Sequence, residues 1–120
     1  VGKLEQGKQE LELAESLLKE NSDWLYYAYS QTILAKVAQF EEDFQQAKRR
    51  LDRAFEYQQL LNCPMGIAQT ELDFAEFYLL QNDHNNAKIR FEKAKLLVKD
   101  KSLFKLEKQL KDFKSLINKR

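Results

Sequence analysis

The residues of this chain that most often do chemistry are few. His84 is the only histidine and Cys63 the only cysteine among 120 residues. His84 follows Asp83 among asparagines, which is no known ligand spacing, so we expect a surface turn there rather than a metal site. Cys63 precedes Pro64 and has no companion histidine to activate a thiolate. There is also no glycine-rich phosphate loop, so we expect no catalytic residue, no metal, no cofactor and no enzyme activity.

The densest aromatic stretch is Trp24-Leu25-Tyr26-Tyr27-Ala28-Tyr29. Rigid aromatic side chains offer a large contact area at low entropic cost, so this stretch is a candidate binding surface. Alternatively, Trp24 and Tyr27 pack against neighbouring helices, and only Tyr26 or Tyr29 faces outward. Tyr29 is the best single candidate for a partner contact.

Basic residues concentrate at the C-terminal end, where segment 99–120 holds eight basic and three acidic residues. Its apolar residues recur three and four apart and form one seam, namely Leu103, Leu106, Leu110, Phe113 and Ile117. Three interpretations remain open: a capping helix with a solvated outer face, a surface for nucleic acid or membrane, or a coiled-coil or self-association contact. The formal charge of +1 argues against a general polyanion binder. We therefore expect neither nucleic acid nor a membrane as the main partner.

The helices that position these residues follow from an internal repeat of 40 residues. Three segments place a small, a large apolar and a second small residue at i, i+4 and i+7 of one helix face. They are Gly7-x-x-x-Leu11-x-x-Ala14, Ala47-x-x-x-Leu51-x-x-Ala54 and Ala87-x-x-x-Phe91-x-x-Ala94. Small residues let a neighbouring helix approach closely, and a fixed interval predicts stacked supersecondary units.

Three glycines and one proline are too few for an all-β fold, and the pattern predicts an all-α chain of about six helices. We expect helices over about 3–20, 24–42, 43–61 and 64–81, a fifth that ends near 99 and a sixth over about 103–118. The predicted turns contain capping residues: Asn21-Ser22-Asp23, Asp43, Asn62-Cys63-Pro64, the run 82–86, and Ser102. The first helix should turn its inward face through Leu4, Leu11, Ala14, Leu17 and Leu18.

The repeat also predicts how the helices pair. Setting 28–54 over 68–94 matches four alanine pairs, at 28 and 68, 35 and 75, 47 and 87, and 54 and 94; it also matches Asp43 with Asp83 and Arg50 with Arg90. The second and third helices should therefore form one antiparallel hairpin, and the fourth and fifth the next. The first helix would be the second half of a hairpin whose first half lies before Val1, so we expect the chain to be a fragment of a longer protein.

These residues resemble the tetratricopeptide repeat (TPR) family over about 7–99. Leu34-Ala35 with Ala38, then Ala47, Leu51 and Ala54, fit the first full repeat, and Phe74-Ala75 with Tyr78, then Ala87, Phe91 and Ala94, fit the second more closely. The chain departs from the family in its longer period, in Gln31 or Glu71 at the early aromatic position, and in lacking the closing proline. It is similar to the longer-period branch found in bacterial peptide-sensing regulators, large helical transcription activators and scaffold proteins.

The resemblance implies an α-solenoid, a right-handed stack whose first helices line a concave groove for a peptide or partner helix. The implied groove residues are Tyr29, Thr32, Lys36, Gln39, Phe40, Gln69, Leu72, Glu76, Leu79 and Leu80. One TPR subfamily grips acidic chaperone tails with a clamp of Lys, Asn and Arg. Asp73 stands among the corresponding positions and would repel a carboxylate, so we do not expect that ligand class.

The sequence therefore predicts a single domain over 1–120. It would comprise a half-repeat helix over 1–20, repeats over 23–61 and 64–99, and a capping helix over 102–119. We expect a non-catalytic protein- or peptide-binding module in a larger cytoplasmic regulator or scaffold, acting in signalling or transcription regulation. Two alternatives stay open: an oligomerisation element that uses the terminal helices, and a basic helical-repeat domain that binds RNA.

Overall fold

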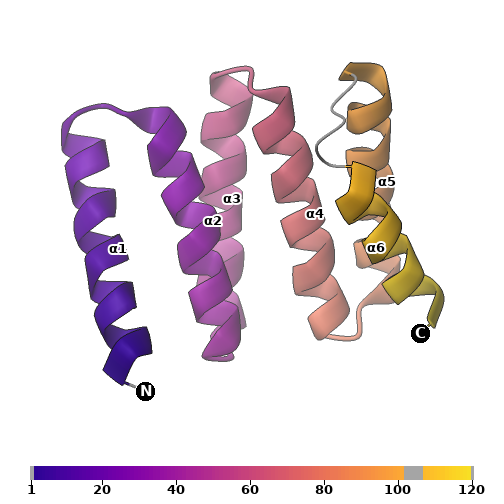
Figure 1. Cartoon of the computed structure of the whole chain (residues 1–120), viewed down its shortest axis with the longest axis horizontal. Coiled ribbons are helices and arrows are strands. Elements are labelled where there is room, and N and C mark those ends of the chain that lie inside the picture. The colour runs from indigo at the N-terminus through magenta and orange to yellow at the C-terminus, as the bar shows by residue number, and fades with distance from the viewer. Residues whose placement is uncertain (1, 102–106, 120) are drawn as a thin grey trace. The chain divides into compact units, whose positions relative to one another are not determined.

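A computed structural model describes residues 2–101 and 107–119 of the chain. The described residues form six α-helices and no strand (Figure 1). The helices are α1 (Gly2–Glu20), α2 (Trp24–Phe40), α3 (Phe44–Leu60), α4 (Pro64–Leu80), α5 (His84–Lys101) and α6 (Glu107–Lys119). The all-α prediction is confirmed. The predicted cap at Ser102 lies outside the described residues.

The helices α2, α3, α4 and α5 begin at 24, 44, 64 and 84, at intervals of 20 residues. A three-residue turn precedes each of them. The middle residue of each turn has left-handed backbone, with φ of 58° at Ser22, 61° at Glu42, 50° at Asn62 and 61° at Asn82. At the second turn Asp43 N donates to Ala38 O (2.8 Å) and Glu42 N donates to Gln39 O (3.0 Å), the Schellman pattern. The same Asp43 then caps α3 by accepting from Gln46 N at 3.2 Å.

The turn before α5 is shorter than predicted. The run 82–86 does not form a turn throughout, because Asp83 Oδ1 accepts from Asn86 N at 3.2 Å and so starts the helix at His84. His84 is therefore a half-buried residue in the first turn of α5. The expectation that His84 is a surface turn residue is therefore wrong, because His84 is the first residue of α5.

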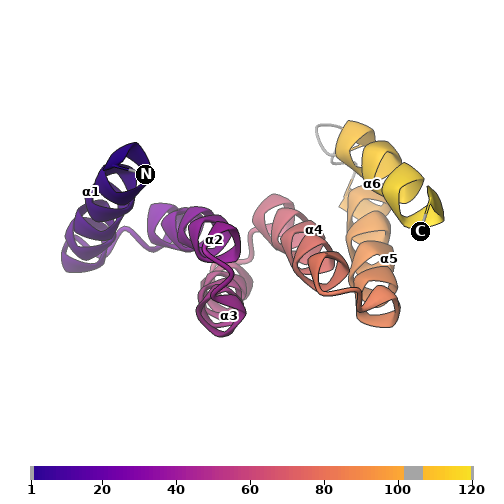
Figure 2. The same ribbon diagram turned by 90° about the horizontal axis from the view of Figure 1, so that it is seen from below.

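The chain divides into two compact units, Val1–Leu61 and Asn62–Arg120, which we call unit 1 and unit 2. In unit 1, α2 and α3 lie side by side as an antiparallel hairpin, and α1 packs on α2 (Figure 2). Close contact between α2 and α3 relies on alanine, since Ala28, Ala35, Ala47 and Ala54 are all 0% exposed. The predicted hairpin and its small-residue contacts are confirmed.

Unit 2 repeats the hairpin with α4 and α5, and α6 packs against α5. Its core joins the alanines of both hairpin helices to Leu110 and Phe113 of α6, and the rings of Phe91 and Phe113 stack at 5.7 Å. Ile117 packs at the edge of this core. The described part of the predicted α6 seam is thus used inside unit 2, whereas Leu103 and Leu106 lie outside the described residues.

The helix α1 is less well covered than its repeat equivalents. Gly7, Leu11 and Ala14 are only half-buried, although the matching positions of α3 and α5 are fully buried against α2 and α4. Leu17 is 49% exposed, so its predicted inward position is wrong. The reason is that α1 packs mainly on α2 and reaches α3 through the Glu15–Arg50 ion pair, which buries a narrower stripe than a hairpin does. The side chain of Leu4 lies outside the described residues.

An ion pair fixes the first turns of α1 to the end of α2. Lys8 Nζ donates to Glu41 Oε1 at 3.2 Å, and this hydrogen bond, with the negative charge of Glu41, raises the pKa of Lys8 above its ordinary 10.5. No helix among the described residues is both long enough and apolar enough to cross a bilayer.

Candidate functional site

Position 50 of the first repeat and position 90 of the second carry the same half-buried arginine, and each needs a carboxylate. In unit 2, Arg90 Nη1 donates to Glu71 Oε1 at 2.7 Å, and the Arg90 guanidinium lies 4.1 Å from the centre of the Phe74 ring. Glu71 comes from α4 and Arg90 from α5, so the α4–α5 hairpin, which we call hairpin two, supplies both charges itself. The pair lies within a shell of limited solvent access, where a charge without a counter-ion is costly.

In the α2–α3 hairpin, which we call hairpin one, the arginine receives its carboxylate from a third helix. The residue that matches Glu71 is the neutral Gln31, and the carboxylate comes from Glu15 of α1. Arg50 Nη1 and Gln31 Nε2 both donate to Glu15 Oε2, and Arg50 Nη1 also donates to Gln31 Oε1 at 3.0 Å. Gln31 is fully buried, and no buried side-chain polar atom in the described part of the chain lacks a partner. This network therefore holds α1, α2 and α3 together.

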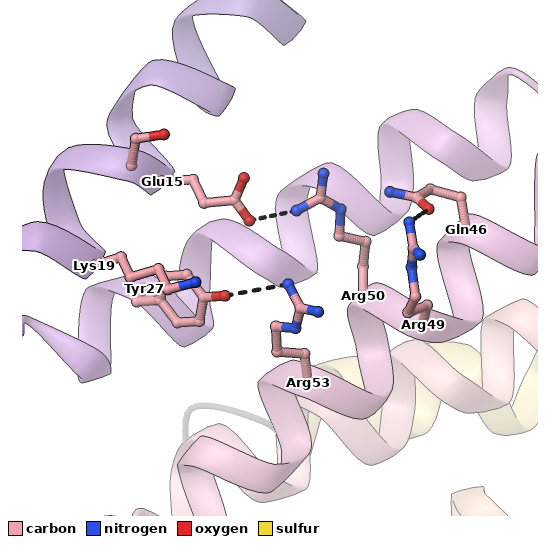
Figure 3. A pocket seen from close by; sticks show the side chains of 8 residues that line it. Glu15, Lys19, Tyr27, Gln46, Arg49, Arg50 and Arg53 are labelled. Atoms are coloured by element: carbon pink, nitrogen blue, oxygen red, sulfur yellow. Dashed lines mark hydrogen bonds and ion pairs between the residues drawn. The ribbon is translucent and has the colours of Figure 1, made fainter.

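Beside the network lies a pocket of about 310 Å³ that belongs entirely to unit 1 (Figure 3). Its lining comes from all three helices: Glu15, Ser16, Lys19, Tyr27, Gln46, Arg49, Arg50 and Arg53. We call it the basic pocket, because four cationic side chains face one carboxylate there. Positions 46, 49, 50 and 53 lie on one face of α3, which is why a single helix supplies three arginines.

Only one of these arginines has its charge neutralised by the protein. Arg50 is paired with Glu15, whereas Arg49 Nη2 donates to the neutral Gln46 amide and Arg53 Nη1 donates to the Tyr27 hydroxyl at 3.4 Å. Within the described ranges, no carboxylate lies within ion-pair distance of Arg49, Arg53 or Lys19. The arrangement is suited to holding an anion.

Two further kinds of site are expected to be absent, a metal site and a reactive cysteine. No group of three or more His, Cys, Asp or Glu side chains there could hold a metal ion. Cys63 is a half-buried free thiol at the N-cap of α4. Neither observation adds a candidate site.

The predicted groove residues of α2 divide into two sets. Tyr29 and Phe40 are 61% and 76% exposed, and Lys36 is exposed with them. Together with half-buried Ile33 they follow one stripe of the helix at i, i+4, i+7 and i+11, which we call the α2 stripe. Thr32 and Gln39 are buried instead.

The predicted groove residues of α4 also divide. Leu80 is 53% exposed and Glu76 is exposed, while Gln69 is half-buried. Leu72 and Leu79 belong to the core of unit 2, at 5% exposure each. The structure thus brings each set together on its own helix, and a shared groove of the two helices stays a prediction.

The aromatic stretch follows the second interpretation given above. Trp24 stacks on Tyr57 of α3 with ring centres 5.0 Å apart, and the buried Tyr27 meets both rings edge-on at 5.5 and 5.2 Å. Tyr26 and Tyr29 are each 61% exposed. The inner aromatics hold α2 on α3, and the outer two are available for a partner.

Sequence reasoning missed the basic pocket, although a signal for it was present. Arg49 breaks the 40-residue repeat, because the matching residue is Ile89. Because the other repeat has an apolar residue at this surface position, packing does not require a charged residue there. No match to the chain was found among protein-family models, curated proteins or solved structures.

Proposed function

We propose that this chain is a non-catalytic module that binds a protein or peptide partner through the α2 stripe. The observation that carries this proposal is the exposure of Tyr29 and Phe40 on a helix whose opposite face is fully packed. Large exposed apolar side chains that share one face mark interaction surfaces. Aromatic residues are also over-represented among the side chains that dominate binding energy.

The second hairpin supports the proposal with a weaker version of the same surface. The residues 40 positions after the α2 stripe are Gln69, Asp73, Glu76 and Leu80. Leu80 keeps an exposed apolar side chain where unit 1 has Phe40, and Glu76 replaces Lys36 with the opposite charge. In a TPR-like arrangement, α2 and α4 would line one groove, and this charge difference would set the direction of a bound peptide.

In this proposal the module serves a larger regulator or scaffold of the longer-period TPR type in the cytoplasm. The resemblance of the repeats to that branch supports this role. The upstream or downstream domains of the parent protein would determine whether the output is signalling or transcription regulation.

Site-specific photo-crosslinking tests the surface directly. A photoreactive phenylalanine analogue replaces Phe40 in one variant and Leu60 in a control, since Leu60 is 74% exposed but lies at the end of α3. We expect one protein adduct from position 40 in the source cell and none of that mass from position 60. Equal adducts from both positions, or none from position 40, would contradict the proposal.

A second candidate function is self-association through α1. Leu13 and Leu17 are 62% and 49% exposed at i and i+4 of this helix. An open apolar face of this kind suits a second copy of the chain. Sedimentation at tens of micromolar tests it: a dimer that Leu13→Glu abolishes would support self-association, and a monomer would end it.

A further inference from the structure

We infer that the basic pocket of unit 1 binds the dianionic phosphate of a phosphomonoester. The pocket shares no residue with the α2 stripe, so this inference stands apart from the proposed function. Phosphomonoesters occur on phosphorylated side chains and on small metabolites, and the chemistry that recognises them is the same in both.

The charge of the pocket is the first argument. Arg50 is neutralised by Glu15, which leaves the positive charges of Lys19, Arg49 and Arg53 at its walls. A carboxylate ligand would neutralise only one of these three. A phosphate dianion neutralises two and also offers three acceptor oxygens to guanidinium groups, which bind phosphate with two parallel hydrogen bonds.

The internal repeat provides a second, independent argument. Arg50 and Arg90 occupy matching positions and both make partly buried ion pairs, so an arginine at this position takes part in the packing of each hairpin. At the position of Arg49 the second repeat has Ile89, which is 52% exposed. A cation at position 49 is therefore not needed for packing the hairpin, and its presence beside Arg53 brings like charges together at a cost that a bound anion removes.

The hydrogen-bond partners of these arginines are neutral and replaceable. The Tyr27 hydroxyl accepts from Arg53 at 3.4 Å, which is a long hydrogen bond, and Arg49 donates to a side-chain amide. Both guanidinium groups can turn toward an anion without breaking an ion pair. The Tyr27 hydroxyl lies in the same lining and is itself a donor for a phosphate oxygen.

The surroundings favour one compact group over a long polyanion. The exposed residues of α1, which forms one wall, include Glu12, one helical turn before the lining residues Glu15 and Ser16. Its carboxylate interrupts a basic track that a nucleic-acid backbone would follow, since such binding needs successive phosphate contacts. A volume of about 310 Å³ admits a phosphate with part of the molecule that carries it.

Titration followed by NMR of backbone and arginine side chains tests the inference at constant ionic strength. The probes are inorganic phosphate, O-phosphoserine, a hexose phosphate and acetate. We expect saturable shifts at Lys19, Arg49 and Arg53 with the three phosphates, and at least tenfold weaker binding of acetate. Tighter binding of phosphoserine than of hexose phosphate would assign the phosphorylated side chain as the source, and the reverse order a metabolite.

The variants Arg49→Gln and Arg53→Gln should each weaken phosphate binding by about tenfold, because each removes one charged donor. Lys93→Gln is the matched control, since Lys93 occupies in α5 the position of Arg53. Both arginines are exposed, so the variants should unfold at the same temperature as the unmodified chain. Absence of saturable shifts, equal weakening by Lys93→Gln, or preferential binding of a single-stranded oligonucleotide would each overturn the inference.

Discussion

At the scale of single residues, the two repeats show one structural requirement met in two ways. A half-buried arginine needs a carboxylate, and hairpin two supplies it from within the hairpin at Glu71. Hairpin one has Gln31 there and receives the carboxylate from Glu15, 35 residues before Arg50 in the chain. Because the carboxylate comes from α1, the ion pair joins α1 to the hairpin. The helix α1 in turn forms one wall of the basic pocket.

Removing that carboxylate should therefore destabilise unit 1. Glu15→Gln leaves Arg50 with only the neutral Gln31, and we expect a loss of about 1–3 kcal/mol in the free energy of unfolding. The double variant Glu15→Gln with Gln31→Glu restores a carboxylate beside Arg50, as Glu71 provides for Arg90, and should recover part of the loss. Urea denaturation measures the stability of both variants. A double variant less stable than Glu15→Gln would contradict the claim that Arg50 needs a carboxylate from either position.

Glu42 carries a backbone conformation that suits glycine or asparagine better. Its φ of 61° matches that of Asn82 in the equivalent turn. Glu42→Asn should raise the free energy of unfolding by about 0.5–1 kcal/mol, because asparagine tolerates this left-handed region at lower cost. The reciprocal variant Asn82→Glu should lower it by a similar amount. Thermal unfolding measures both, and a shift of the unfolding temperature in the same direction for both variants would refute the argument.

At the scale of helices, alanine determines how closely each hairpin closes. Ala47 and Ala87 are 0% exposed at matching positions of α3 and α5, directly against the first helix of each hairpin. Their small side chains leave room for the α2 and α4 backbones and for little else. The half-buried Gly7 of α1 shows the same position without a hairpin partner.

Overpacking this contact should be costly. Ala47→Leu is expected to lower the free energy of unfolding by about 1–3 kcal/mol, since the added atoms must push α2 and α3 apart. Lys48→Leu, one residue away on the exposed face, should change it by no more than about 0.5 kcal/mol. Denaturant titration of both variants is sufficient, and similar costs for the two would mean that the helix register is wrong.

At the scale of the whole chain, the sequence predicted what depends on spacing along one helix and missed what depends on contacts between helices. The helices, the two hairpins and their buried alanines follow from the spacing of residues along the chain, and the structure confirms them within the described ranges. The basic pocket arises where α1 meets α3, through residues as far apart as Glu15 and Arg50. Leu17 was misplaced for the same reason, because its exposure depends on how many helices cover α1.

The candidate functional residues show the same difference between what the sequence implies and what contacts between helices determine. Tyr29 and Phe40 are groove residues that the TPR resemblance implies, and the structure leaves both exposed. The resemblance implies the same groove role for Leu72 and Leu79, yet they pack in the core of unit 2. Substituting either would unfold the hairpin before it reported on a partner, so a test of function must use the exposed residues.

The measurement that tests the central claim most directly is the affinity of the crosslinked partner for α2 stripe variants. Tyr29→Ala and Phe40→Ala should each weaken binding by about tenfold or more, as truncation of exposed aromatic anchors does. Leu60→Ala, which removes an equally exposed apolar side chain elsewhere, should leave the dissociation constant unchanged. An unchanged dissociation constant for both stripe variants, with unfolding temperatures equal to that of the unmodified chain, would contradict the account.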